Sequence, residues 1–219
     1  NNGDGTFDLS TAVPTGDFPN TIRTVDIDKD GFLDVLTSDS GNGGTISLHR
    51  GNGDGTFQPV EQIPSLNIWG GTIAADFDSD TWPDLITRVG QTLIPLINDT
   101  VGGFVPGAPT PAIPNMDTLQ GVDVGDFNGD TLNDFAITFY ATSFPWRRLQ
   151  IVLNDGIGGY TLGDARSLGT NGGVIHAHDV DGDIDLDLIV LRPYISDGVT
   201  VLYNNGLGVF SAQADFPTH

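Results

Sequence analysis

A nine-residue acidic motif occurs four times along this chain at nearly constant spacing. The copies begin at Asp26, Asp76, Asp126 and Asp179 and read DIDKDGFLD, DFDSDTWPD, DFNGDTLND and DVDGDIDLD. Successive copies begin 50, 50 and 53 residues apart, and a short apolar run follows each one. Periods of about 20–50 residues are typical of solenoids, propellers and other arrays in which one supersecondary unit is stacked on the next. The motif therefore predicts a repeat architecture for the whole chain and, in each copy, a possible ion site.

A second, glycine-rich motif recurs out of phase with the first. It reads NNGDGTF at 1–7, GNGDGTF at 51–57, NDTVGGF at 98–104, NDGIGGY at 154–160 and NNGLGVF at 204–210. Asn-Gly and Asp-Gly pairs between apolar runs indicate β-hairpins, because Gly and Asn tolerate positive φ. Each unit is thus expected to hold four short strands, in the first unit about Thr21–Ile27, Leu33–Ser38, Thr45–Arg50 and Thr56–Ile63. The acidic motif is predicted to join strands one and two, and the glycine-rich motif strands three and four.

Four such units without helical periodicity predict an all-β fold, a β-propeller built from four-stranded blades. We expect one repeat domain over residues 1–219, with blades at about 20–65, 70–110, 119–165 and 172–216. Five glycine-rich motifs against four acidic ones leave an orphan outer strand within residues 1–13, at Thr6–Val13, and a last strand at Val209–Ala214. The chain could then be part of a larger propeller, close an eight-bladed ring with a second copy, or complete a blade of a neighbour and form a filament.

The acidic motif has the ligand pattern of a calcium loop. Side-chain oxygens stand at positions 1, 3, 5 and 9, position 7 can add a backbone carbonyl, and Ca²⁺ takes about six to eight oxygen ligands. The predicted ligands of up to four Ca²⁺ ions are Asp26, Asp28, Asp30, Phe32 and Asp34; Asp76, Asp78, Asp80, Trp82 and Asp84; Asp126, Asn128, Asp130, Leu132 and Asp134; and Asp179, Asp181, Asp183, Asp185 and Asp187. The alternative is that individual loops are polar turns or decayed sites that keep the hairpin geometry.

Differences between the loops predict a ranking of affinity. Only the first loop has Gly at position 6, Gly31, whereas the others have Thr81, Thr131 and Ile184, for which a positive φ is costly. The third loop also carries Asn128 in place of a carboxylate. We therefore expect the first loop to bind most tightly and the third least tightly.

Composition excludes several classes of partner. The net charge of −21 argues against nucleic acid and against anionic membrane surfaces, which are themselves polyanions. The acids are 28 Asp and a single Glu, and 16 of the Asp lie in the four motifs, as expected for ligands and turn residues. There is no cysteine and no apolar run long enough to span a membrane. The chain starts without Met or a signal peptide, which suggests a processed or excised segment, and several calcium sites favour an extracellular location.

No catalytic motif stands out, so we expect no enzyme. A nucleophile elbow, a zinc-binding helix motif and a phosphate loop are all absent from the sequence. Of the four histidines (His49, His176, His178 and His219), His176 and His178 alternate before the fourth loop and fit half-buried polar positions better than a transition-metal site or an acid–base pair. Trp69, Trp82 and Trp146 are interpreted first as packing between blades and second as surfaces that stack on sugars. The sequon Asn98-Asp99-Thr100 predicts an N-glycan at Asn98 if the source glycosylates.

The acidic motifs and the GNGDGTF-type turns together resemble FG-GAP/VCBS repeats, as in integrin α-subunit propellers and several fungal and bacterial lectins and secreted enzymes. The resemblance covers essentially the whole chain. It implies calcium and a propeller of about seven or eight blades, whereas this chain has only four acidic motifs. The expected function is an extracellular calcium-binding scaffold or adhesion protein that binds copies of itself, another extracellular protein or a glycan. The alternatives are a carbohydrate-binding lectin module and an accessory propeller of a secreted polysaccharide-active enzyme.

Overall fold

The computed structural model describes residues 4–6, 12–41, 44–64, 72–143, 146–169, 173–192 and 198–217. Every regular element assigned in these ranges is a β-strand, which confirms the all-β prediction. They form four antiparallel four-stranded sheets, and in each sheet the strands lie in chain order. The sheets are arranged as a four-blade β-propeller, as predicted from the repeats.

The strand bounds follow the repeat. The first blade contains β1 (Pro19–Val25), β2 (Asp34–Asp39), β3 (Thr45–His49) and β4 (Glu61–Pro64). The second contains β5 (Ala74–Ala75), β6 (Asp84–Val89), β7 (Thr92–Asn98) and β8 (Phe104–Pro106). The third contains β9 (Met116–Gly125), β10 (Asp134–Ala141), β11 (Arg147–Asn154) and β12 (Tyr160–Gly169). The fourth contains β13 (Ile175–His178), β14 (Asp187–Arg192), β15 (Gly198–Tyr203) and β16 (Ala212–Pro217).

The two repeated motifs occupy the hairpins expected of them. Each acidic motif joins the first and second strands of its blade, and its ninth residue pairs with the residue just before the motif, as Val25↔Asp34 and Gly125↔Asp134 show. The glycine-rich motifs at 51–57, 98–104, 154–160 and 204–210 join the third and fourth strands. The orphan strand predicted at Thr6–Val13 falls largely on residues 7–11, which lie outside the described residues, so self-association through it stays a prediction.

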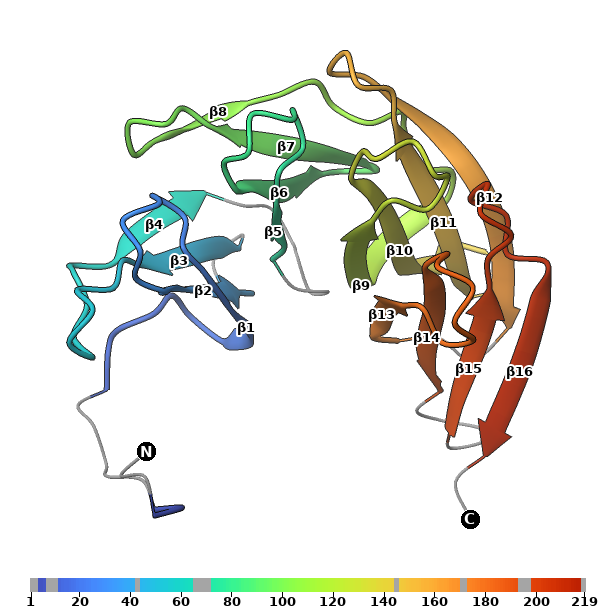
Figure 1. The fold of residues 1–219 in the computed structure, drawn as a ribbon, viewed down its shortest axis with the longest axis horizontal. Coiled ribbons are helices and arrows are strands. Elements are labelled where there is room, and N and C mark those ends of the chain that lie inside the picture. The colour runs from blue at the N-terminus through green and yellow to red at the C-terminus, as the bar shows by residue number, and fades with distance from the viewer. Residues whose placement is uncertain are drawn as a thin grey trace.

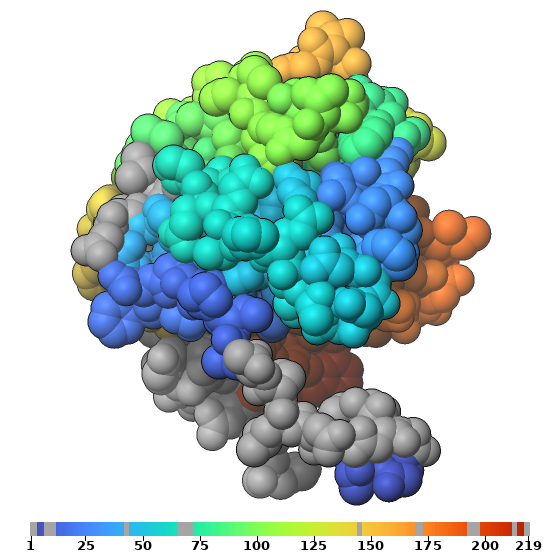
Figure 2. Space-filling model, turned by 90° about the vertical axis from the view of Figure 1, so that its left-hand side faces the viewer, coloured from blue at the N-terminus to red at the C-terminus, as the bar shows by residue number. Residues whose placement is uncertain are grey.

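The blades follow one another along an open arc (Figure 1). The first strands of the blades lie toward the inside of the arc and the fourth strands along its outside, and the first and fourth blades form its two ends. Figure 2 views the arc from the side of the first blade, whose residues, in blue to teal, lie directly against the green second blade. The ring is thus not closed by these residues.

The hydrophobic core lies between the blades. Strand side chains alternate between the two faces of a sheet, and each apolar face packs against the next blade. Leu36 and Leu48 of the first blade share a cluster with Leu85 and Leu96 of the second, and two further clusters join the second to the third blade and the third to the fourth. Full burial of such a side chain stabilises the fold by roughly 1.5–3 kcal/mol, so stacking of the blades is the main source of stability.

Candidate metal centres

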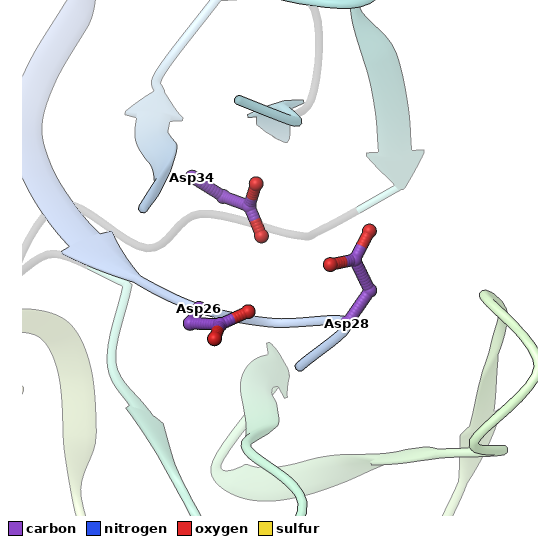
Figure 3. Close-up of side chains that lie close together, drawn as sticks. All are labelled: Asp26, Asp28 and Asp34. Atoms are coloured by element: carbon purple, nitrogen blue, oxygen red, sulfur yellow. The ribbon is translucent and has the colours of Figure 1, made fainter. Parts of the chain in front are cut away.

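Three of the four acidic loops gather carboxylates around a common point. The first, third and ninth residues of the loop offer oxygens that all lie within 4.8 Å of one another, in the groups Asp26–Asp28–Asp34, Asp76–Asp78–Asp84 and Asp179–Asp181–Asp187. Figure 3 shows the three carboxylates of the first loop turned toward the same space. The predicted fifth-position ligands Asp30, Asp80 and Asp183 are not in these groups.

Backbone N–H groups fix the direction of the carboxylates. In every loop the N–H of position 6 donates to the position-1 carboxylate, at 3.0, 2.8, 2.7 and 3.1 Å in chain order. The N–H of position 7, where Phe32, Trp82, Leu132 and Asp185 were predicted to offer carbonyls, donates to the position-5 carboxylate at 2.8–3.0 Å. These turns explain why Asp at alternate positions, rather than the longer Glu, builds the loop.

Position 6 adopts a left-handed conformation in all four loops. The φ angle is 91° at Gly31, 77° at Thr81, 72° at Thr131 and 84° at Ile184. The loops therefore share one geometry, and the three non-glycine residues hold it at a cost in free energy because their Cβ atoms disfavour it. The sequence difference seen at this position changes strain and not shape.

The ninth acid has a second role that the sequence did not reveal. Asp34, Asp84, Asp134 and Asp187 are fully buried. In each case one carboxylate oxygen accepts the N–H of position 2 of the motif at 2.8–3.1 Å, and the other accepts the N–H of residue 51, 98, 154 or 204 at 2.7–2.9 Å. The ninth acid therefore ties the acidic hairpin to the glycine-rich hairpin of the same blade.

Burial also makes three of these four carboxylates harder to ionise. Desolvation, opposed by the two backbone N–H donors and reinforced by neighbouring acids, raises the pKa of Asp84 to about 6 and that of Asp134 to about 6. Desolvation raises the pKa of Asp34 in the same direction. A cation placed among the carboxylates would offset both the desolvation cost and the repulsion between acids.

The third loop has an amide in place of the carboxylate at position 3. Asn128 at position 3 accepts the N–H of Asp130 through Oδ1 at 3.0 Å and donates from Nδ2 to the Asp130 carboxylate at 2.9 Å. Its predicted partners Asp126 and Asp134 keep the positions of their counterparts. The loop thus retains the fold of the motif with one fewer negative charge facing its centre.

Three asparagines connect neighbouring blades. The Nδ2 groups of Asn98, Asn154 and Asn204 donate to the carbonyl of position 2 in the preceding acidic loop, Ile27, Phe77 and Phe127, at 2.8, 3.0 and 2.9 Å. Asn98 is 5% exposed, so a glycan on its Nδ2 would require loss of this contact. The glycan at Asn98 stays a prediction, and it would have to displace this contact. Sequence reasoning missed this hydrogen bond between blades, although an asparagine begins each of the glycine-rich motifs at 98, 154 and 204.

The remaining candidate residues are dispersed. His49 is buried in β3, His178 is exposed, and His176 is exposed with its Nδ1 3.6 Å from Asp123. Trp146 is 51% exposed, which does not fit packing between blades. Trp69 and His219 lie outside the described residues. Among the described residues, no helix is long and apolar enough to cross a membrane.

A cavity of about 430 Å³ lies where the first two blades meet. It is lined by Asp28 and Asp30 of the first loop, Trp82 of the second, and Arg50, Glu61 and residues 100–102. The Arg50 guanidinium contacts Asp28 at 3.2 Å and Glu61 at 3.3 Å, and donates to the Gly102 carbonyl at 2.9 Å. The Lys29 ammonium lies 5.0 Å from the centre of the Trp82 ring. Trp82 therefore contributes to the contact between blades and also borders open space.

Comparisons with solved structures find the same fold in larger propellers. A lectin of Agrocybe aegerita, described for specific recognition of non-reducing terminal N-acetylglucosamine, superposes with a TM-score of 0.57 at 21% identity over 88% of this chain and 50% of that one. BBS1N, in complex with ARL6DN, superposes with a TM-score of 0.58 at 12% identity over 89% of this chain and 55% of that one. The chain therefore spans about half the length of these structures. No curated protein sequence matches it.

One family model matches the chain directly. Residues 26–87, which contain the first two acidic loops and the hairpin between them, match the FG-GAP-like repeat. The third and fourth blades repeat the same loop, the same glycine-rich hairpin and the same sheet topology. The chain is a four-blade β-propeller in which residues 26–87 match the FG-GAP-like repeat.

Proposed function

We propose that this propeller is an extracellular, calcium-stabilised scaffold that works by binding and not by catalysis. The observation that carries the proposal is the convergence of three carboxylates within 4.8 Å in each of three loops, with one of the three buried every time. Buried, mutually repelling carboxylates destabilise a fold unless a cation accompanies them. Calcium at the millimolar level outside cells would supply that cation.

The ligand chemistry favours calcium over other metals. The groups consist of carboxylates alone, which suit hard cations such as Ca²⁺, Mg²⁺ and Mn²⁺. The loops are irregular and place carboxylates from alternate positions around one point, and Ca²⁺ accepts such variable geometry whereas Mg²⁺ demands a near-ideal octahedron. We therefore assign Ca²⁺ to the first, second and fourth loops, and a weaker site to the third.

Charge around the first loop opposes the ranking expected from Gly31. Arg50 lies 3.2 Å from Asp28, and a guanidinium at this distance partly neutralises the carboxylate that a cation would need. In this loop the low strain at Gly31 raises the expected affinity for a cation, whereas the partial neutralisation of Asp28 by Arg50 lowers it. The relative affinity of the first loop remains a prediction.

Calorimetric titration with Ca²⁺, together with thermal unfolding in calcium and in excess chelator, tests the proposal. We expect at least three bound ions per chain and a fall in Tm on chelation, since ligand at about 100-fold above its Kd adds roughly 2.7 kcal/mol. Asp181→Asn should remove or weaken one site, whereas Asp54→Asn, an exposed carboxylate in a glycine-rich turn, should leave the count unchanged. An identical Tm in calcium and chelator would contradict the proposal.

A second candidate function is carbohydrate binding in the cavity between the first two blades. The cavity places an indole next to carboxylates and a guanidinium, a combination that can stack on a sugar ring and hydrogen-bond its hydroxyl groups. The fold is also that of a lectin, although at 21% identity this concerns the fold alone. Binding to a glycan array that is lost in Trp82→Ala and kept in Trp146→Ala would support it, and an array without signal would contradict it.

A further inference from the structure

A second cavity, of about 390 Å³, lies in the third blade and away from the acidic loops. It is lined by residues 148–150 of β11, residues 165–167 of β12, Phe139 of β10 and Pro114, which precedes β9. Phe139 lies near the end of β10 and Arg148 near the start of β11, whereas the acidic loop and the glycine-rich turn adjoin the opposite ends of these strands. The cavity is therefore separate from the candidate metal centres.

The strand pairing places the side chains that border this cavity on one face of the blade. Arg148 is opposite Phe139 on β10 and opposite Ser167 on β12, and directly opposed residues of antiparallel strands project to the same face. Gln150, two residues after Arg148, projects to that face as well. Phe139 belongs to the core cluster that joins the second and third blades, so this is the face turned toward the second blade.

The polar groups at this face are held in place, except that the guanidinium of Arg148 has no partner. Among the residues that the structure describes, this guanidinium makes no hydrogen bond and no ion pair, and its Nε is buried. Gln150 is 5% exposed, and its Nε2 donates to backbone carbonyls at 2.8, 3.1 and 3.3 Å, so its amide can add only an acceptor to the cavity. The Ser167 hydroxyl accepts the N–H of Gly169 at 3.1 Å and keeps its own proton to donate.

A guanidinium without a counter-ion is unexpected in so acidic a chain. The sequence has 8 Lys and Arg against 29 Asp and Glu. The two other arginines of this blade have partners: Arg147 lies over the Tyr140 ring at 4.3 Å, and Arg166 lies 3.8 Å from Asp164. Partial burial of a cation costs free energy unless an opposite charge accompanies it. Arg148 therefore offers an unused positive charge to the cavity.

The first blade shows how the same corner is filled when the chain itself supplies an anion. Alignment through the two motifs and the strand pairing makes Asp39 the counterpart of Phe139. It likewise makes Thr45 the counterpart of Arg148. The Asp39 carboxylate accepts the N–H of Gly16 at 3.0 Å and the Thr45 hydroxyl at 3.3 Å. In the third blade an aromatic ring replaces this carboxylate and a cation replaces the hydroxyl, so the corner keeps its donor but has no anion of its own.

We propose that this cavity binds a small ligand with one carboxylate on an apolar ring or chain. The carboxylate contacts Arg148 and the apolar part lies against Phe139 and Pro114. A guanidinium matches a carboxylate through two parallel hydrogen bonds, and the Ser167 hydroxyl can donate a third. The net charge of −21 disfavours anions of higher charge, and the cavity volume lies within the range of about 300–1,000 Å³ typical of small-molecule sites.

Titration with sodium benzoate, followed by the NMR shifts of the backbone amides in saturating calcium, tests the site. We expect saturable binding, with the largest shifts at residues 148–150 and 165–167. Benzamide has the same shape without the charge and should bind about tenfold more weakly or worse, the loss expected for one charge-assisted hydrogen bond. Sodium sulfate should compete poorly. An absence of saturable shifts at these residues, equal affinity for benzoate and benzamide, or sulfate binding as tight as benzoate binding would each overturn the proposal.

Two arginine variants separate a local contact from a general effect of charge. Arg148→Gln should weaken benzoate binding by about tenfold or more, whereas Arg23→Gln, which removes an exposed arginine of β1 in the first blade, should leave it unchanged. Because the Arg148 guanidinium has no partner to lose, Arg148→Gln should keep the Tm of the parent or exceed it. Benzoate should raise the Tm of the parent more than that of Arg148→Gln. Equal losses of affinity in the two variants would refute the assignment to Arg148.

A second pair of variants keeps the test decisive if Arg148→Gln folds poorly. Ala165 is exposed, lines the cavity and is opposite Gln150, which places it diagonally across from Arg148. Ala165→Asp brings a carboxylate within reach of the guanidinium and should weaken benzoate binding by about tenfold or more relative to Ala165→Asn, which has nearly the same size and no charge. The same affinity in these two variants would show that Arg148 does not hold the carboxylate of the ligand.

Discussion

Replacement of Ile184 by glycine should stabilise this protein, although it removes a large apolar side chain. Ile184 occupies position 6 of the fourth loop with φ of 84° and is 89% exposed, so little packing is lost. The left-handed conformation costs a residue with a Cβ about 1–2 kcal/mol, and more for a β-branched one. Glycine loses about 0.5–1 kcal/mol through its greater freedom in the unfolded chain. The net gain is therefore about 0.5–1 kcal/mol.

The matched control is Ile157→Gly in the glycine-rich turn of the third blade. Ile157 is 91% exposed and is not among the residues with positive φ, so glycine there brings only the entropic loss and should destabilise by about 0.5–1 kcal/mol. Urea unfolding of both variants in saturating calcium measures the two free energies. The reasoning fails if Ile184→Gly destabilises the chain as much as Ile157→Gly does.

Two further predictions concern the contacts between blades and the buried histidine. Asn154→Ala should destabilise by about 1–3 kcal/mol in urea unfolding, because it removes the 3.0 Å bond to Phe77 and leaves a buried carbonyl unpaired, whereas the exposed Asn52→Ala should cost less; equal effects would contradict the bridging role. Burial lowers the pKa of His49, so the folded chain holds it neutral while the unfolded chain takes up a proton below about pH 6.5, and stability is lost as pH falls through that value. His49→Leu should therefore lose less stability than the parent between about pH 7 and pH 5 when both are unfolded in urea; parallel losses would show that His49 does not contribute.

The fold and the acidic loops could be predicted because both are encoded locally. Ligand spacing, Asn-Gly turns and alternating apolar residues act within one hairpin, and the repetition of each signal reinforces it. The same locality explains why the contact of Asn98 could not be predicted. Its sequon is a three-residue pattern, while its hydrogen-bond partner Ile27 lies 71 residues away in the preceding blade. Only the stacked structure places the two together.

The difference between the two ends of the arc was also beyond the sequence pattern. Val180 reads like Ile27, since both follow the first aspartate of their motif, yet one is exposed and the other buried. Whether the face of a blade is covered depends on the neighbouring blade, and the repeated sequence motif carries no information about that neighbour. The one local signal was the change at residue 51, where glycine interrupts the series of asparagines at 98, 154 and 204.

The candidate metal loops and the stacking of the blades are connected through single residues, yet they use different positions of the motif. Asp84 accepts the N–H of Asn98, whose Nδ2 donates to Ile27, whose own N–H donates to Asp34. This series of hydrogen bonds runs from one acidic loop to the next, so a cation in one loop, as proposed above, would also order the anchor of the following blade. The third loop shows that the two roles are separable. It has Asn128 where the other loops have a carboxylate, and the amide still accepts the N–H of Asp130, while Asp134 holds the hairpins together as its counterparts do.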